Sequence, residues 1–172
     1  EVLSLNRCLS PESDYQVSRW YEETILPRIL NLSLNPTKIY RALDEIPALT
    51  EKIQQHLYGK INALGLDDYE LIFYDITSSY FEHTNSNLAR FGLSRDHRGD
   101  KKQILLALAV TKKGFPFYWQ VLEGNTADTK TVQGFVDELK RLFNIKQACL
   151  VMDKGMVSIA NMEKIQAQNF NY

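Results

Sequence analysis

The pattern of apolar and polar positions divides the chain into a helical first part and a mixed second part. Up to about residue 66, apolar residues recur every three or four positions, which is the period of an amphipathic helix. Ser10-Pro11 and Asn35-Pro36 each join an N-cap residue to a proline, so we expect helices to begin there. With a third helix expected from about Thr50 to Leu64, residues 1–66 are predicted to form a small helical region.

From Glu70 onward the apolar residues gather in short runs that have the length of strands. A helical pattern starting at Asp128 or Thr129, which we expect to cap it, separates the third run from the fourth, and a last helix is expected near the end. A helical crossover joins parallel strands, whereas a short turn joins antiparallel ones. Residues 67–172 are therefore predicted to form a mixed α/β sheet with flanking helices. The expected strands are Leu71–Ile76, Gln103–Val110, Phe115–Leu122 and Ala148–Met152, and the expected helices run from Asp128 to Phe143 and from Val157 to Gln168.

Two of the apolar runs each deliver one aspartate, Asp75 and Asp153, at their ends. A buried strand normally excludes an unpaired carboxylate, because the ion loses its hydration. We therefore expect the two side chains to lie together at the carboxyl edge of the sheet and to share a divalent metal. Mg²⁺ is often held by one or two carboxylates together with substrate phosphates, and two such ions about 4 Å apart promote phosphoryl transfer. The residues alone leave a simpler alternative open, in which each aspartate caps a strand-to-loop turn.

Composition and charge narrow the class of protein. With 44% apolar and 24% charged residues among 172, the chain is typical of a soluble globular protein, and no apolar run is long enough to span a membrane. The net charge of −1 gives no general case for nucleic-acid binding, but residues 90–102 carry five basic and two acidic side chains. Cys8 and Cys149 lack metal-site spacing, which favours a reduced, intracellular setting.

Other kinds of site have little support. No glycine-rich phosphate loop is present, because Gly92 and Gly99 have the wrong spacing, and no serine or cysteine is placed as a nucleophile. We expect Glu82 to be a solvated acid at the rim of the sheet. Because the chain begins at Glu1 rather than Met and stops at Tyr172, we expect a piece of a longer protein.

Four motifs, taken in order, resemble those of a known family. They are Tyr74 to Glu82, Gly92 to Gln103, Glu123 to Asp128 and Val151 to Met156. Their order and spacing resemble the DDE transposases of bacterial insertion sequences. The resemblance implies an RNase H-like fold and metal-dependent cleavage and strand transfer of DNA, in a bacterial cytoplasm and associated with the nucleoid.

The same resemblance implies roles for individual residues. Asp75 and Asp153 would be catalytic acids that bind Mg²⁺ or Mn²⁺. The partners would be DNA, as transposon ends and target, and a second subunit in a homodimer. Candidate DNA-binding residues are Arg95, His97, Arg98, Lys101, Lys102, Asn125, Thr126 and Lys154.

One part of the family pattern is missing. The third acid of these enzymes is a glutamate in a tyrosine–arginine–glutamate–lysine signature, which this chain lacks; Glu163 follows Asp153 too closely and has other surroundings. The domain at residues 67–172 is therefore expected to be incomplete at its C-terminus. The alternatives are a catalytically inactive remnant that only binds DNA or self-associates, and another RNase H-like nuclease.

Overall fold

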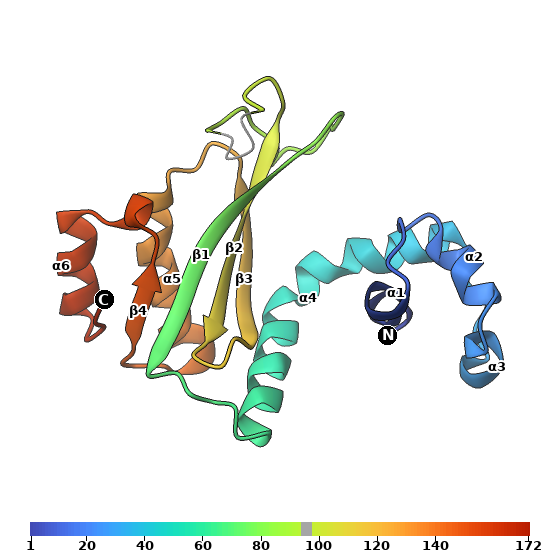
Figure 1. The fold of residues 1–172 in the computed structure, drawn as a ribbon, viewed down its shortest axis with the longest axis horizontal. Helices are drawn as coiled ribbons and strands as arrows, with labels where there is room; N and C mark the ends of the chain where they lie inside the picture. The colour runs from blue at the N-terminus through green and yellow to red at the C-terminus, as the bar shows by residue number, and fades with distance from the viewer. Residues whose placement is uncertain (94–97) are drawn as a thin grey trace. The chain divides into compact units, whose positions relative to one another are not determined.

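The computed structural model describes residues 1–93 and 98–172, which form two compact units, residues 1–50 and 51–172 (Figure 1). The division falls inside one long helix, α4 (Pro36–Ala63). It lies earlier in the chain than the boundary expected from the sequence, because the last part of α4 brings Tyr58 and Ile61 to the core of the second unit. In the described part of the chain, no helix combines the length and apolar character needed to cross a bilayer.

The first unit is helical, as the sequence predicts, but its helices begin elsewhere. It contains α1 (Val2–Leu9), α2 (Val17–Glu22), α3 (Leu26–Leu30) and the start of α4. The expected helix start at Ser10-Pro11 is wrong, because these residues close α1 instead. The Asn6 side-chain amide donates to the Ser10 carbonyl at 2.8 Å and holds that end of the helix.

The start of α4 is confirmed, whereas the expected break within it is wrong. Asn35 caps α4, since its side-chain oxygen accepts a hydrogen bond from the Lys38 amide at 2.9 Å. Pro47 lies inside the helix without ending it. A proline in a helix interior removes one hydrogen-bond donor and adds a local clash, and the helical period of the flanking residues continues past this defect.

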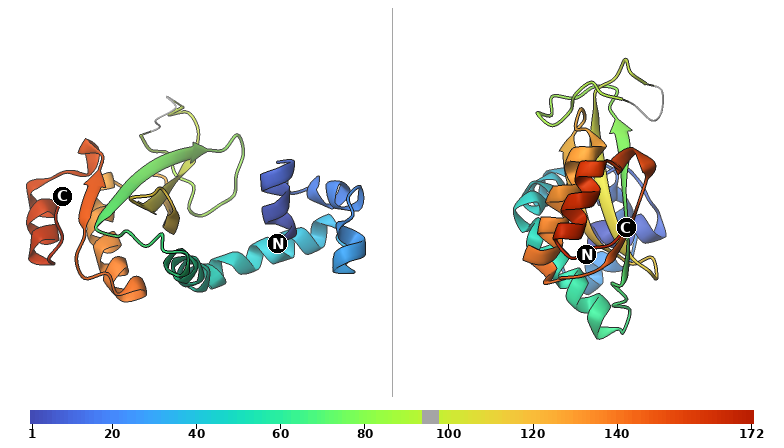
Figure 2. Two further views of the ribbon diagram at one scale, coloured as in Figure 1. Left: turned by 60° about the horizontal axis from the view of Figure 1, so that its bottom comes forward. Right: turned by 90° about the vertical axis from the view of Figure 1, so that its left-hand side faces the viewer.

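The second unit is built on a mixed sheet of four strands, which confirms the predicted mixed α/β class. The strand order is β3-β2-β1-β4, with β1 antiparallel to β2, β2 antiparallel to β3, and β1 parallel to β4. Figure 2 gives two further views of the strands and of the helices beside them. The strands are β1 (Leu71–Tyr80), β2 (Gln103–Thr111), β3 (Pro116–Glu123) and β4 (Cys149–Met152).

One face of this sheet forms the core against α5 (Asp128–Phe143). The ring of Tyr74 on β1 stacks on Phe135 of α5 with centroids 4.0 Å apart. After β4, a short 3-10 helix η1 (Lys154–Met156) leads to α6 (Ile159–Ala167), which contacts α5. Beyond α6, Asn171 forms a parallel bridge with Cys149.

The opposite face of the sheet is open within the described residues of this unit. Side chains that alternate with the core positions point to it, and five of the apolar ones are between 36% and 43% exposed. Because a period of two puts alternate residues on opposite faces, the two faces are set by the sequence pattern itself. The five exposed apolar residues are Phe73, Leu106, Leu108, Val121 and Val151.

Candidate active site

The parallel pairing of β1 with β4 brings Asp75 and Asp153 next to each other. The register pairs Tyr74 with Met152, and each aspartate is the next residue along its strand. Asp153 has extended backbone angles, φ −67° and ψ 151°, so the strand geometry continues through it. Adjacent strands lie about 5 Å apart, which places the two residues as neighbours although 78 positions separate them in the sequence.

Both carboxylates belong to the open face of the sheet. Tyr74 and Leu150 are buried against α5, at 1% and 2% exposure. Asp75 follows Tyr74 by one residue, and Asp153 follows Leu150 by three, so the alternation directs both to the other side. Both aspartates are exposed, and the carboxylates therefore keep access to water and to a ligand approaching this face.

One detail of the sequence prediction is wrong: Asp75 does not end its strand. β1 continues to Tyr80, because the antiparallel ladder with β2 extends from Ile72 paired with Thr111 to Tyr80 paired with Gln103. Only β4 stops at this level of the sheet. The pair therefore arises where a short strand ends beside the middle of a long one.

Asp153 also acts as the turn-capping residue that the sequence left as an alternative. Its side chain accepts a hydrogen bond from the Lys154 amide at 2.6 Å and caps η1. Capping uses one carboxylate oxygen and holds the side chain in place, so this role and metal binding are compatible. For Asp75, which lies within a strand, the turn-capping alternative does not apply.

The turn after Asp153 is tied to the start of α5 by a residue that sequence reasoning missed, Asn161. This side chain is 8% exposed, and its amide donates to the carbonyl oxygens of Thr129 at 2.7 Å and Met156 at 3.0 Å. One buried amide thus fixes η1 against α5 and, through it, the position of Asp153. A polar residue inside the apolar spacing of a short helix was the available signal.

The segment Gly124–Asp128 lies close to the turn after Asp153. A cleft of about 490 Å³ is lined by Asn125, Thr126 and Asp128 on one side and by Gly155 on the other. A Cβ atom added to Gly155 would meet a carboxylate oxygen of Asp128 at 3.5 Å. The expected cap differs: Ala127 is the N-cap of α5, and Asp128 is the first helical residue. An acidic residue in the first turn is favourable because it faces the positive end of the helix dipole.

The basic segment before β2 is paired with acids of its own. The Arg98 guanidinium contacts Asp100 at 2.9 Å, and Lys101 contacts Glu82 at 2.7 Å. The hydrogen bond from Lys101 lowers the pKa of Glu82, and the bond from Arg98 lowers the pKa of Asp100. Glu82 is exposed, as the sequence predicts, but it serves as an ion-pair partner.

The remaining DNA-binding candidates differ in what the structure says of them. Lys102 and Lys154 are exposed, and neither forms an ion pair with another described side chain. Arg95 and His97 lie outside the described residues. Phosphate binding at Arg98 or Lys101 would have to compete with their carboxylate partners.

The two carboxylates suit a hard divalent cation, but they are two ligands and not a complete set. Among the residues that the structure describes, no group of three or more histidine, cysteine, aspartate or glutamate side chains is arranged to hold a metal ion. Two neighbouring exposed carboxylates nevertheless match the way Mg²⁺ is usually held, with substrate phosphates and water as its other ligands. The two carboxylates therefore suit Mg²⁺ or Mn²⁺ when further oxygen ligands complete the coordination.

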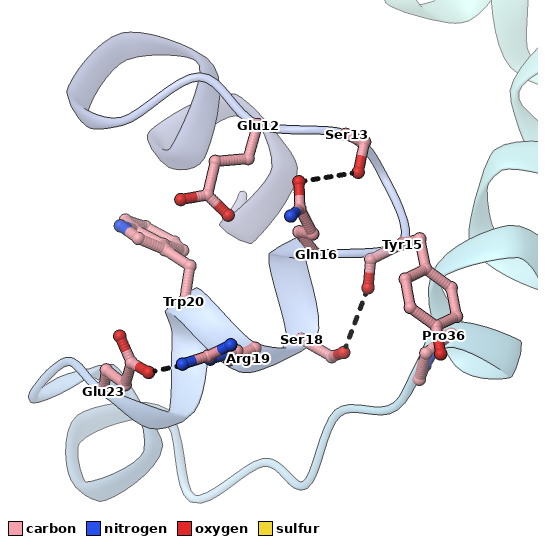
Figure 3. Close-up of a pocket in the computed structure, with 9 residues that line it drawn as sticks. All are labelled: Glu12, Ser13, Tyr15, Gln16, Ser18, Arg19, Trp20, Glu23 and Pro36. Carbon is pink, nitrogen blue, oxygen red and sulfur yellow. Dashed lines mark hydrogen bonds and ion pairs between the residues drawn. The ribbon is translucent and has the colours of Figure 1, made fainter.

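A larger cleft, of about 780 Å³, lies within the helical unit (Figure 3). Trp20 and Glu12 flank it, and Arg19 pairs with Glu23 at 3.1 Å. Its charged groups are of both signs, and it lacks a pair of adjacent carboxylates such as Asp75 and Asp153. We therefore assign the chemistry to the sheet.

Comparison with known proteins gives structural likeness alone. No family model matches the chain. No curated protein sequence gives a significant match. Among solved structures, the Mos1 strand transfer complex is 12% identical with a TM-score of 0.43, covering 99% of this chain and 55% of that one.

Two further Mos1 structures give similar values. The catalytic domain of the Mos1 mariner transposase is 13% identical with a TM-score of 0.40, over 70% of this chain and 56% of that one. The Mos1 mariner paired end complex with Mn is 12% identical with a TM-score of 0.42, over 99% and 56%. The chain thus spans little more than half the length of these proteins, and inferences about its function rest on its own geometry.

Proposed function

We propose that this chain carries two of the acidic residues of a DDE-type transposase active site on an RNase H-like sheet. Its parent reaction would be metal-dependent cleavage of a DNA phosphodiester followed by strand transfer. The observation that carries the proposal is the register of β1 and β4, which makes Asp75 and Asp153 neighbours on an open face. Two exposed carboxylates from adjacent strands are what a divalent cation and a DNA phosphate require.

In this mechanism the residues of the chain would bind the metal ion and position the DNA. Asp75 and Asp153 would bind Mg²⁺ or Mn²⁺, which when bound activates the attacking oxygen and stabilises the leaving oxygen. The Lys154 amide holds the Asp153 carboxylate, and Asn161 holds the turn that contains Met156. Exposed Lys102 and Lys154 would position phosphates, while Asn125 and Thr126 would contact DNA from the cleft beside Gly155.

The test is nicking of supercoiled plasmid with Mg²⁺ or Mn²⁺ by the full-length parent protein, together with titration of Mn²⁺ binding. Asp75→Ala and Asp153→Ala should each abolish metal-dependent nicking and weaken Mn²⁺ binding at least tenfold. Glu163→Ala is the matched control, because this exposed acid on α6 is excluded from the proposed site. Nicking retained by either aspartate variant would overturn the assignment.

A second candidate is a protein that binds DNA without cutting it. This candidate is favoured because the described residues contain no group of three or more histidine, cysteine, aspartate or glutamate side chains that could hold a metal ion. Salt-dependent DNA binding with no nicking by the unmodified chain would support it. Another RNase H-like nuclease is the third candidate; cleavage of RNA or RNA–DNA hybrid without any joining of DNA strands would favour that reading.

A further inference from the structure

A segment before β2, residues 88–93, lies against the end of the sheet and has a fixed backbone. The Gly124 amide donates to the Leu88 carbonyl at 3.2 Å, and Arg90 exchanges two backbone hydrogen bonds with Gln103, at 3.0 and 2.8 Å. Ala89, between them, is completely buried. This part of the connection is therefore held to the sheet almost as a further strand would be.

The close contact between this segment and the sheet continues at Gly92. A Cβ atom at this position would lie 2.1 Å from the Gly124 carbonyl oxygen, so only glycine fits. The Gln103 side-chain amide, in a residue 1% exposed, donates to the carbonyls of Leu93 at 3.1 Å and Gly124 at 2.9 Å. Phe91 and Leu93, on either side of Gly92, thus start from an anchored backbone.

These two apolar side chains nevertheless point into solvent. Phe91 is 59% exposed and Leu93 is 94% exposed. A single exposed leucine is ordinary, but here a hydrogen-bonded backbone holds two neighbouring apolar side chains mostly in solvent. We call Phe91, Gly92 and Leu93 the ridge, since they stand between two clefts.

Each apolar side chain of the ridge lines one of those clefts. Phe91 lines a cleft of about 250 Å³ together with His83, Lys101 and Lys102. Leu93 lines the cleft of about 490 Å³ that also contains Gly155, two residues after Asp153. Glu82 and Asp100 also line the smaller cleft, where Lys101 is paired with Glu82 and Lys102 is exposed. The ridge thus has Lys102 on one side and the Asp153 turn on the other.

We propose that the ridge contacts unstacked nucleobases of the DNA strand that is cut, an inference that rests on the proposed function. Aromatic side chains stack on bases, and apolar side chains such as leucine wedge between base steps. Lys102, exposed and outside the ion pairs of its neighbours, binds the phosphate beside the base on Phe91. DNA is the occupant because the sequence of residues 82–102 carries more basic than acidic side chains, five against three, and because Lys102 beside Phe91 is exposed and outside the ion pairs of Arg98 and Lys101, which suits a polyanion better than an apolar protein surface.

Fluorescence of 2-aminopurine in a DNA duplex with unpaired ends tests the proposal, using the full chain and EDTA so that no cleavage occurs. The unmodified chain should increase the fluorescence as the base leaves its stack. Phe91→Ala should weaken binding at least fivefold, since stacking contributes about 1–3 kcal/mol per base, and should leave the salt dependence unchanged. Phe91→Trp should restore binding, whereas Lys102→Ala should reduce the salt slope by about one unit.

The matched control is Ile159→Ala, which removes an apolar side chain that is 81% exposed on α6 and should leave affinity unchanged. Affinity and fluorescence of Phe91→Ala and Leu93→Ala equal to those of the unmodified chain would overturn the proposal, as would an equal loss with Ile159→Ala. Asp75→Asn separates the two ideas, because it removes a metal ligand and leaves the ridge intact. If it abolishes nicking while the ridge variants bind normally, the ridge proposal fails and the proposed function stands.

Discussion

Replacing Gly124 by alanine should unfold the sheet unit much more easily than any comparable change on its surface. The added Cβ would lie 1.9 Å from the Gln103 carbonyl oxygen and 2.8 Å from that of Arg90. Both are backbone oxygens, and each accepts a hydrogen bond from the backbone amide of the other residue, so neither can turn aside as a flexible side chain would. Reaching the 3.0 Å that real Cβ contacts keep requires a shift of about 1.1 Å.

That shift has a cost that follows from the bonds it breaks. The backbone amide of Gly124 would lose its hydrogen bond to the Leu88 carbonyl. The side-chain amide of Gln103 would lose its hydrogen bond to the Gly124 carbonyl. Each hydrogen bond contributes about 1 kcal/mol net, and a buried polar group left unpaired costs about 1–3 kcal/mol. We therefore expect the free energy of unfolding to fall by about 3–5 kcal/mol, a large part of the stability of a typical domain.

The matched control is the same substitution in α5. Gly134 has nothing within 4 Å of an added Cβ and lies in the helix, so Gly134→Ala should stabilise the unit by about 0.5–1 kcal/mol. Urea unfolding is best followed through Trp119 on β3, in a Trp20→Phe background, because the chain has two tryptophans and only Trp119 belongs to this unit. Two alanine variants of equal stability would refute the reasoning.

Two further predictions concern the site and the acid dependence. Asn161→Ala should lower the free energy of unfolding by about 1–3 kcal/mol, because two buried carbonyls lose their donor, and should weaken Mn²⁺ binding; titration with unchanged Mn²⁺ affinity would contradict its positioning role. The Arg141 hydrogen bond lowers the pKa of Glu51, so this carboxylate stabilises the fold above its unfolded pKa of about 4.3, and the gain is lost as the pH falls through the lowered folded value. Glu51→Gln should therefore reduce the urea midpoint at pH 7, and the reduction should shrink as the pH falls below about 4.3; a reduction that stays the same at every pH would argue against the ion pair.

The sequence pattern predicted the mixed sheet correctly because the spacing of apolar residues along a strand or helix follows which side chains are buried. Alternate residues of β1 and β2 are buried, and this period of two is visible in the amino-acid sequence. The amphipathic stripe of α5 likewise predicted its packing face. The predicted helix starts at Ser10-Pro11 and near Thr50 were wrong, because Ser10 instead closes α1 with a contact from Asn6, and α4 continues unbroken past Thr50.

By itself the sequence determined which carboxylates interrupt apolar strands, and so singled out Asp75 and Asp153. Only the tertiary structure decided that they are neighbours, because the register between β1 and β4 depends on packing between segments far apart in the chain. The same holds for the contacts that support the site: Asn161 reaches back to Thr129, and Gly92 meets Gly124. Such contacts leave no periodic trace in the sequence, since each joins single residues whose spacing is set by the fold.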